Sequence, residues 1–384
     1  MKYKLGEIFN LQMGKTPDRH SPKFWNEGTE PWISIDDLTK CIKYIENTAE
    51  KITATAVDES GIKIIPKNTV IMSFKLSIGK VAITPKEMYS NEAIMSFIDK
   101  GVLKIEPVYL YYLLMHKDWD TGTNKAVMGK TLNKASLSQM TVNIHGYSEQ
   151  LEIIKALDTA SSIITARKQQ LQKLDELVKA RFVELFGDPL GNDKGWQKAL
   201  IAEVCNAIFG GGTPSKSHPE YFAGSIPWVS PKDMKSSVIN DSIDHITEDA
   251  IAHSTTNLVP ANSVLMVIRS GILKHTLPVA INSLPVTINQ DMKAFVPNET
   301  VKTAFLLYFF KAIENDVLAG VRGVTADNID FKAFQKRTII VPPLALQEQF
   351  VAFVTQTDKS KVAVQKALDE AQLLFGSLMQ KYFG

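Results

Sequence analysis

Two loop segments combine hydroxyl, basic and turn-forming side chains, a combination that could contact nucleic acid. Residues 14–23 read GKTPDRHSPK and residues 212–218 read GTPSKSH, so both join a Thr-Pro pair to hydroxyl and basic side chains. Cationic side chains contact phosphates, and Arg, Lys and Ser also hydrogen-bond to base edges. The alternative is that Thr and Pro only shape a turn. The candidate DNA contacts are Lys15, Thr16, Arg19, Lys23, Thr213, Ser215, Lys216 and His218.

Two further pairs of segments combine glycine with basic residues. A first pair follows short apolar runs around Gly79 and Gly271, and a second pair surrounds Gly129 and Gly323. A solvated hairpin explains these cations about as well as phosphate contact does. The additional candidates for DNA contact are Lys75, Lys80, Lys130, Arg269, Lys274 and Arg322.

No motif for catalysis or metal binding accompanies these loops. The 7 histidines form no HExxH motif and no cluster with cysteine, so we expect no metal site. Residues 129–131 read GKT, but Asn124 stands where a phosphate-binding loop needs its first glycine. Asp36 and Asp37 are expected to cap a helix or turn rather than to hold a nuclease metal. We therefore expect a non-catalytic chain that binds no cofactor, with a cryptic DNA-acting enzyme as the alternative.

Four aromatic residues at repeated positions invite two interpretations. Trp25, Trp32, Phe222 and Trp228 could stack on bases, because each ring presents a flat π face. Large aromatics close to proline are more often anchors of a core. We therefore predict that they are core residues.

The positions of these segments reveal an internal duplication. The sequence PWIS at 31–34 is matched by PWVS at 227–230, and NEAI at 91–94 by NQDM at 289–292. Near the ends of the copies, Ser148-Glu149-Gln150 is aligned with Gln347-Glu348-Gln349. Ordered matches at one nearly constant offset do not arise by chance, so each half of the chain should have the same fold.

Each copy begins with a part that is broken by Pro and Gly. Apolar runs at 69–74 and 80–84 predict strands, and compact helices are expected near 107–117 and 302–314. This pattern favours an α+β fold with antiparallel strands over a regular βαβ alternation.

A long helix should follow each of these parts. Residues 148–186 contain no Pro or Gly, with Ser148 as a plausible N-cap and Gly187 at the end. A second long helix is expected after Pro342-Pro343. Since each helix has one apolar stripe, the two should pair antiparallel as a coiled coil and set the globular domains at opposite ends of a rigid spacer. The stripe residues are Leu157, Ile164, Leu171, Leu174, Val178, Leu185, Val364, Leu368, Ala371, Phe375 and Leu378.

These elements predict four segments along the chain. They are a first globular domain at 1–145, a central helix at 146–188, a second globular domain at 189–342 and a C-terminal helix at 343–384. The net charge of +2 neither requires nor excludes DNA. Two distant cysteines, no signal peptide and no long apolar run lead us to expect a cytoplasmic protein without membrane contact.

The arrangement resembles the specificity (S) subunit of type I restriction-modification systems. The resemblance covers nearly the whole chain and rests on the repeated Gly-x-Thr-Pro and Pro-Trp-(Ile/Val)-Ser segments and on the helix start PPLALQEQ at 342–349. The first long helix departs from the pattern, because Gly146-Tyr147 replaces the Pro-Pro-Leu lead.

The resemblance implies a function for each part. Two target recognition domains would each read half of a bipartite, asymmetric site in double-stranded DNA. The helices would fix the spacing and bind two methyltransferase (M) subunits, which carry S-adenosylmethionine, in a complex with restriction/translocase (R) subunits. The alternative is the equivalent subunit of a related bipartite type II system, in which cleavage and methylation share one partner.

Overall fold

The computed structural model describes residues 1–75, 77–119, 124–126, 129–321 and 327–384, and it divides into two compact units. Unit 1 comprises Met1–Lys168 with Lys366–Gly384, and unit 2 comprises Gln169–Gln365. Two long helices, α7 (Tyr147–Phe186) and α12 (Leu344–Phe383), contribute one half to each unit. The predicted long helices are thus confirmed.

Unit 1 contains two main sheets. A four-stranded antiparallel sheet has the order β2-β8-β5-β6, and a three-stranded sheet has the order β4-β3-β7. Two short pairs, β1-β11 and β10-β9, complete it. Its strands are β1 (Lys2–Lys4), β2 (Phe9–Met13), β3 (Glu30–Ile33), β4 (Glu50–Ile52), β5 (Val70–Ser73), β6 (Val81–Ile83), β7 (Tyr89–Ser90), β8 (Ile94–Asp99), β9 (Asn124–Ala126), β10 (Gly129–Thr131) and β11 (Thr141–Asn143). Its shorter helices are α1 (Leu5–Ile8), α2 (Pro22–Trp25), α3 (Ile35–Lys40), α4 (Ala54–Ser60), α5 (Pro107–His116) and α6 (Lys134–Gln139).

Unit 2 repeats this topology. The order β13-β20-β17-β18-β15 corresponds to the four-stranded sheet plus one strand, β16-β14-β19 to the three-stranded sheet, and β12-β21 to β1-β11. Its strands are β12 (Gln197–Leu200), β13 (Cys205–Gly210), β14 (Ile226–Val229), β15 (Val238–Ile239), β16 (His245–Ile246), β17 (Val264–Val267), β18 (Val279–Asn282), β19 (Thr287–Ile288), β20 (Met292–Pro297) and β21 (Thr338–Val341). Its shorter helices are η1 (Pro219–Phe222), η2 (Pro231–Asp233), α8 (Glu248–Ala252), η3 (Gly271–Lys274), α9 (Thr303–Ala312), α10 (Glu314–Ala319) and α11 (Phe331–Phe334).

The duplication and the α+β class predicted from the sequence are confirmed, with one correction to the strand directions. Three short pairs, β3·β7, β14·β19 and β15·β18, are parallel rather than antiparallel. A parallel pair needs a long crossover connection. The chain between β3 and β7 supplies one, because it contains α3, β4, α4, β5 and β6.

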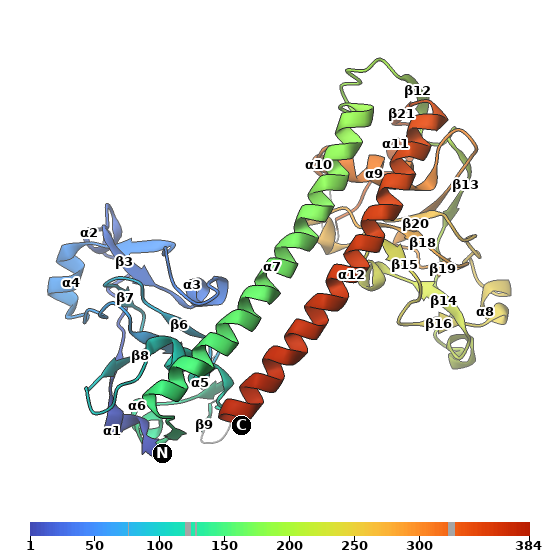
Figure 1. Ribbon diagram of the computed structural model, residues 1–384. Coiled ribbons are helices and arrows are strands. Elements are labelled where there is room, and N and C mark those ends of the chain that lie inside the picture. Colours follow the sequence, from blue (N-terminus) through green and yellow to red (C-terminus); the bar gives the residue numbers. More distant parts are fainter. Residues whose placement is uncertain (76, 120–123, 127–128, 322–326) are drawn as a thin grey trace. The chain divides into compact units, whose positions relative to one another are not determined.

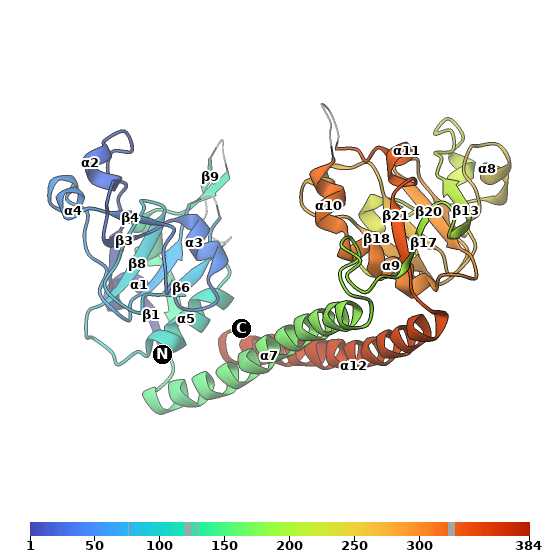
Figure 2. The same ribbon diagram turned by 90° about the horizontal axis from the view of Figure 1, so that it is seen from above.

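In each unit an apolar helix lies between the sheet and the halves of the long helices. Figure 1 shows α5 in this place in unit 1, and Figure 2 shows α9 in unit 2. Leu157 of α7 joins the α5 core of unit 1 together with Met379 of α12. Phe182 of α7 stacks on Phe305 of α9, with ring centroids 5.7 Å apart, and also contacts Phe350 of α12.

The long helices run antiparallel within each unit, as predicted. The beginning of α7 packs with the end of α12 in unit 1, and the end of α7 packs with the beginning of α12 in unit 2. All eleven predicted stripe residues are buried or half-buried: Leu157, Ile164, Leu171, Leu174, Val178, Leu185, Val364, Leu368, Ala371, Phe375 and Leu378. Between the apolar positions, Lys361 of α12 forms an ion pair with Asp175 of α7 at 2.7 Å. The stripe is therefore partly polar.

The helix starts require two corrections. Helix α7 begins at Tyr147, so Ser148 lies inside the helix and is not its N-cap. The aligned glutamine was also wrong, because the counterpart of Gln150 is Gln347 and not Gln349. Gln150 and Gln347 are 1% and 0% exposed, whereas Gln349 is exposed.

The two buried glutamines make the same hydrogen bonds. The Oε1 atom of Gln150 accepts from the N–H of Glu106 (3.1 Å), and that of Gln347 accepts from the N–H of Lys302 (2.8 Å). Each Nε2 donates to two carbonyl oxygens, those of Lys104 and His145 in unit 1 and those of Thr300 and Pro342 in unit 2. Each glutamine thus ties the start of its long helix to the N-terminus of α5 or α9.

We predict that Gln347→Ala destabilises unit 2, because it leaves one N–H and two carbonyl groups without their partner. An unsatisfied buried polar group costs about 1–3 kcal/mol. Calorimetric unfolding should show one lowered transition, whereas the exposed control Gln349→Ala should leave every transition unchanged. Equal effects of the two substitutions would contradict this role.

Candidate nucleic-acid interface

In unit 1, three candidate segments converge on one turn between β7 and β8. The N–H of Gly14 donates to the carbonyl of Ile94 (3.1 Å), and the N–H of Phe74 donates to that of Ala93 (3.0 Å). The N–H of Leu132, which follows β10, donates in turn to the carbonyl of Phe74 (3.0 Å). Residues 91–94 therefore organise all three segments.

Unit 2 forms the same convergence with its own residues. The N–H of Gly212 donates to the carbonyl of Ile288 (3.0 Å), as the N–H of its counterpart Lys15 does to that of Ser90 (2.8 Å), and the N–H of Ile268 donates to that of Asp291 (2.8 Å). The N–H of Ile329 donates to the carbonyl of Ile268 (2.9 Å). The sequence comparison found the repeated Asn-x-x-(Ile/Met) segments but gave them no role, because backbone hydrogen bonds leave no trace in residue types.

In each copy one glycine and one threonine hold the first loop against this turn. A Cβ atom on Gly14 would lie 2.2 Å from the carbonyl oxygen of Asn91, and one on Gly211 would lie 1.7 Å from that of Asn289. Only glycine allows an approach this close. The hydroxyl of Thr16 donates to Glu92, and that of Thr213 donates to Gln290. Both threonines therefore use their hydroxyl groups in holding the loop.

The repeated tryptophans hold the same loops by hydrogen bonds. The indole N–H of Trp32 donates to the carbonyl of Lys15 (3.1 Å), and that of Trp228 donates to the carbonyl of Gly212 (3.0 Å). Their exposed fractions are 1% and 9%. Both are core residues, as predicted. Trp25 and Phe222 are only half-buried and contact these indoles edge to face.

Of the acidic pair that follows Trp32, Asp37 caps helix α3, as expected, and Asp36 pairs with Lys40. Asp37 accepts from the backbone N–H and the hydroxyl of Ser34 with one oxygen and from the N–H of Ala49 with the other. Asp233 accepts in the same way from Ser230 and from Ile243. Among the described residues no group of three or more His, Cys, Asp or Glu side chains could hold a metal ion.

The electrostatics of unit 1 show that candidates from different loops lie near one carboxylate. Burial opposes ionisation of Glu92, but the Thr16 hydroxyl, a backbone N–H and the cations Lys75 and Arg19 together lower the pKa of Glu92 below its usual value. Of these groups Thr16 contacts the carboxylate directly, whereas Lys75 and Arg19 act on it through their charge and Arg19 is itself paired with Glu50. In unit 2 the neutral Gln290 replaces this carboxylate.

Five of the nine cationic candidates whose side chains the structure describes form an ion pair with an acidic side chain. Arg19 pairs with Glu50, and Arg269 pairs with Asp291 at 2.6 Å. The remaining pairs are Lys23–Glu59, His218–Glu220 and Lys274–Asp327. Ion pairs at a surface are worth about 0–1 kcal/mol, so a phosphate group can replace the carboxylate at little cost.

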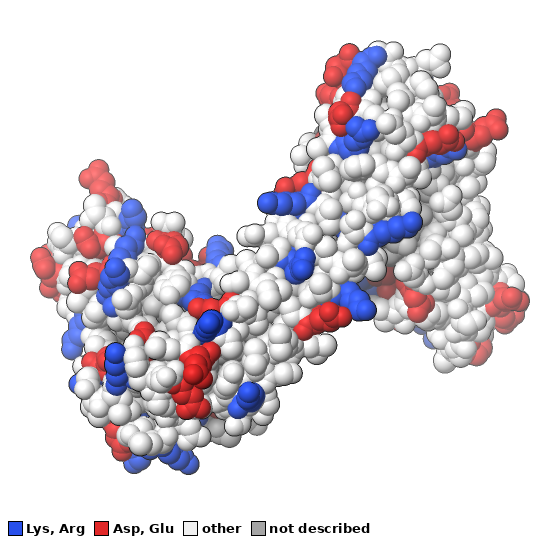
Figure 3. Space-filling model, in the orientation of Figure 1, with Lys and Arg blue, Asp and Glu red and all other residues white. Residues whose placement is uncertain are grey.

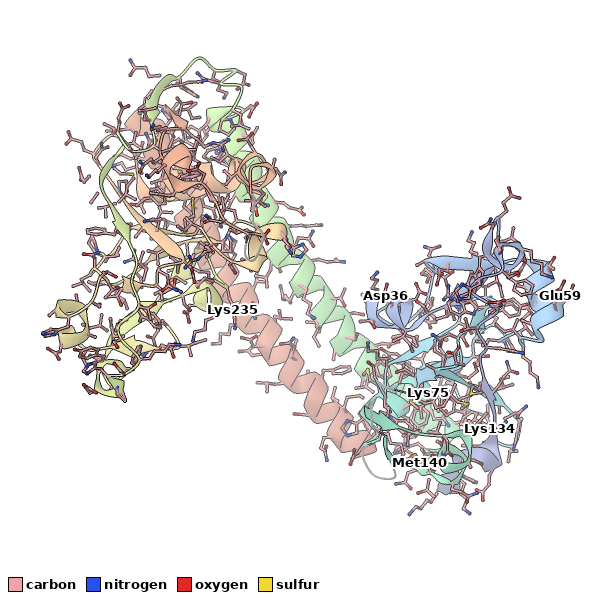
Figure 4. All side chains as sticks on the ribbon, turned by 180° about the vertical axis from the view of Figure 1, so that it is seen from behind. Asp36, Glu59, Lys75, Lys134, Met140 and Lys235 are labelled. Atoms are coloured by element: carbon pink, nitrogen blue, oxygen red, sulfur yellow. The ribbon has the colours of Figure 1, made fainter. Side chains whose placement is uncertain are left out.

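Not all candidates gather at the turn. Lys15 donates to the carbonyl of Ser60 at the end of α4, where Glu59 pairs with Lys23, and Lys80 donates to the hydroxyl of Thr39. Figure 4 shows Glu59 and Lys75 at separate places on unit 1.

The remaining candidates divide as follows. The hydroxyl of Ser215 lies 2.6 Å from that of Ser217, and Lys216 lines a cavity that we describe below. Lys130 belongs to β10, but its side chain lies outside the described residues, as does Arg322.

The surface has no single charge. On the face that Figure 3 shows, basic and acidic side chains alternate over both units. No helix among the described residues is long and apolar enough to cross a membrane.

The long helices carry exposed apolar residues that sequence reasoning did not select. Leu177 of α7 and Leu374 of α12 occupy equivalent positions, counted from Gln150 and Gln347, and are 49% and 52% exposed. The signal was available, because each is a leucine outside the apolar stripe of its helix.

Comparison with known proteins places these features in a family. Residues 1–176 and 193–371 match the family described as "Type I restriction modification DNA specificity domain". The chain is 24% identical to the type I restriction enzyme MjaIX specificity subunit of Methanocaldococcus jannaschii, over 98% of this chain and 92% of that one. It is 35% identical to the EcoR124I/EcoR124II specificity subunit of Escherichia coli, over 54% of this chain and about half (52%) of that relative.

Two solved structures have a similar fold. The S subunit of a type I restriction-modification system from M. genitalium gives a TM-score of 0.58 at 14% identity, covering 100% of this chain and 96% of that one. A chain from work on complex assembly and conformational transition of the type I system gives 0.60 at 17% identity, covering 100% and 97%. At these identities the likeness concerns the fold alone.

We predict that Gly211→Ala disrupts the first loop of unit 2, because the new methyl group would overlap the carbonyl of Asn289. Overpacking of this kind costs about 1–3 kcal/mol. The matched control is Gly271→Ala, whose Cβ meets no atom within 4 Å. Thermal unfolding and amide exchange at 212–218 should change only in Gly211→Ala. A neutral result would mean that the loop is not held as described.

Proposed function

The chain belongs to the family of type I restriction-modification DNA-specificity subunits, and from this membership we propose that its two globular copies read two different half-sites of one bipartite DNA sequence. The observation that carries the proposal is the repeated three-segment convergence. Its backbone frame is the same in both copies, whereas the side chains differ. Arg19 corresponds to Lys216, Lys75 to Arg269, and Glu92 to Gln290. A shared frame with different side chains suits two readers of different sequences.

The same frame supports DNA contact by the basic candidates. Thr16, Arg19 and Lys75 in unit 1, and Thr213, Lys216 and Arg269 in unit 2, come from segments that meet at the central turn. The two arginines that form ion pairs, Arg19 and Arg269, have side chains that are 45% and 48% exposed, so phosphates can compete with the carboxylates for them. For Lys130 and Arg322 the proposal rests on the sequence alone.

The chain supplies recognition and assembly, and the catalytic groups belong to its partners. We assign the M subunits, with their S-adenosylmethionine, to the faces of α7 and α12 that carry Leu177 and Leu374. An exposed leucine at the same place in each copy offers two equivalent contacts, which fits two copies of one subunit. The R subunits complete the complex.

We predict that Leu374→Asp weakens binding of one M subunit, because it places a charge on an apolar contact. The effect should be about 10-fold or more in Kd, since a buried unpaired charge costs more than the about 1.4 kcal/mol that corresponds to a factor of 10. Light scattering of the mixture should show a complex with one M subunit, and the double variant with Leu177→Asp should bind none. The control Glu370→Gln changes an exposed position on the same helix. Two bound M subunits in the double variant would refute the assignment.

The long helices provide the test of the whole proposal. One heptad inserted into both α7 and α12 adds about 10.5 Å at 1.5 Å per residue, which is about three base pairs at 3.4 Å each. Methylome sequencing of cells that carry each form should give the same two half-sites with a gap longer by about three base pairs. An unchanged gap would rule out the helices as the spacer, and the absence of any bipartite methylated site would rule out the function.

A further inference from the structure

Each copy contains two aromatic rings that meet at an angle and form a corner, and the group that packs into this corner differs between the copies. The corner is formed by Trp25 and Trp32 in unit 1 and by Phe222 and Trp228 in unit 2. The ring centroids are 5.2 and 5.9 Å apart, and both pairs meet edge to face. Each corner adjoins its Thr-Pro loop, because the indole N–H groups of Trp32 and Trp228 donate to backbone carbonyls of that loop.

In unit 1 the chain fills the corner with its own planar cation. The guanidinium carbon of Arg19 lies 4.0 Å from the ring centre of Trp25 and 4.6 Å from that of Trp32. Both terminal nitrogens of Arg19 donate to the carboxylate of Glu50 on β4. A stacked and charge-paired guanidinium leaves no aromatic face for another ligand.

In unit 2 the corresponding residues leave the corner open. Lys216 stands at the position of Arg19 and Asp244 at that of Glu50, but Asp244 pairs with Lys232 at 2.6 Å. Among the described residues the Lys216 ammonium has no hydrogen bond or ion pair. A cavity of about 740 Å³ remains, lined by Lys216, Phe222, Trp228 and Lys232 among others.

The lining identifies the class of ligand. Aromatic faces bind flat π systems, as the guanidinium in unit 1 demonstrates, and the free ammonium of Lys216 attracts an anion. A nucleotide unit has both groups, a base and a phosphate. Lys232 and Asp244 of the lining neutralise each other, so the charge left in the cavity is the ammonium of Lys216, which repels an arginine from a partner protein.

We propose that the open corner of unit 2 holds one nucleobase that has left the DNA stack, with Lys216 at the adjoining phosphate. The inference rests on the proposed function, since it deepens DNA reading by this unit. Stacking on an aromatic side chain and unstacking from the duplex are of comparable size, so the corner can offset the cost of displacing a base. Unit 1, whose corner is occupied by Arg19, holds none.

The test uses the full chain with its M subunits and duplexes that contain the methylated site. A single abasic position is moved through both half-sites, and each duplex is titrated with the wild type, Phe222→Ala and the matched control Trp25→Ala. Phe222 is half-buried, so its replacement leaves the core in place. On the intact duplex Phe222→Ala should weaken binding about 10-fold.

We expect the effect of Phe222→Ala on affinity to disappear at a single abasic position. At the abasic position that lacks the docked base, the wild type and Phe222→Ala should bind equally. The effect of Trp25→Ala on affinity should instead be the same on every abasic duplex as on the intact one. Lys216→Arg, which offers the corner a guanidinium as in unit 1, should weaken binding to the intact duplex and should have no effect at that abasic position. Additive behaviour of Phe222→Ala at every position, with site-specific binding by the wild type intact, overturns the inference and leaves the proposed function standing.

Two other outcomes also decide the matter. If Phe222→Ala releases an M subunit rather than DNA, the corner binds protein and the inference is wrong. If the wild-type complex shows no site-specific binding, the proposed function fails together with the inference.

Discussion

The candidate interface depends on backbone hydrogen bonds to the turn that precedes β8 in unit 1 and β20 in unit 2. Gly14 bonds to Ile94 and Phe74 bonds to Ala93, and Leu132 is joined to the turn indirectly, through its bond to Phe74. Backbone groups are satisfied whatever side chains the residues carry. The loops can therefore keep their positions while their side chains change, which is what a pair of readers with different targets requires.

The close approach of the first loop limits this freedom at a few points. Gly14 and Gly211 cannot be replaced without moving the loop, and Trp32 and Trp228 support it through a single hydrogen bond each. Around these fixed points the charges differ. In unit 1 the charges of Lys75 and Arg19 help to lower the pKa of Glu92, whereas in unit 2 the neutral Gln290 takes the place of Glu92 and Arg269 pairs with Asp291. The frame is common to both copies and the electrostatics are individual.

Much of the fold could be predicted because it depends on patterns within short segments. The long helices, the strands β5 and β6, and the burial of Trp32 and Trp228 all follow from local periodicity and composition. The internal repeat could be predicted for the same reason, since it compares residue types directly.

The rest depends on partners that lie far apart in the sequence. The parallel pairs β3·β7 and β14·β19 and the pairing of Arg19 with Glu50 could not be predicted, because no local pattern specifies them. The predicted alignment of the two helix starts was wrong for a related reason. Gln347 and Gln349 are the same residue type two positions apart, and only the structure shows that Gln347 is the one that accepts from the N–H of Lys302. The DNA contacts of the individual side chains stay predictions.

The ion pair between Lys361 and Asp175 has a consequence for how unit 2 assembles. The side chain of Lys361 is 21% exposed, so most of it lies against the neighbouring helix. An apolar stripe alone gains similar burial when two helices slide past each other by one heptad. A slid alignment would separate the ammonium from Asp175 and leave Asp358 of the same helix, 3.4 Å away, as its partner. Because Asp175 is 64% exposed, the pair adds only a small preference for the native alignment, about 0–1 kcal/mol, to the burial that the apolar stripe provides.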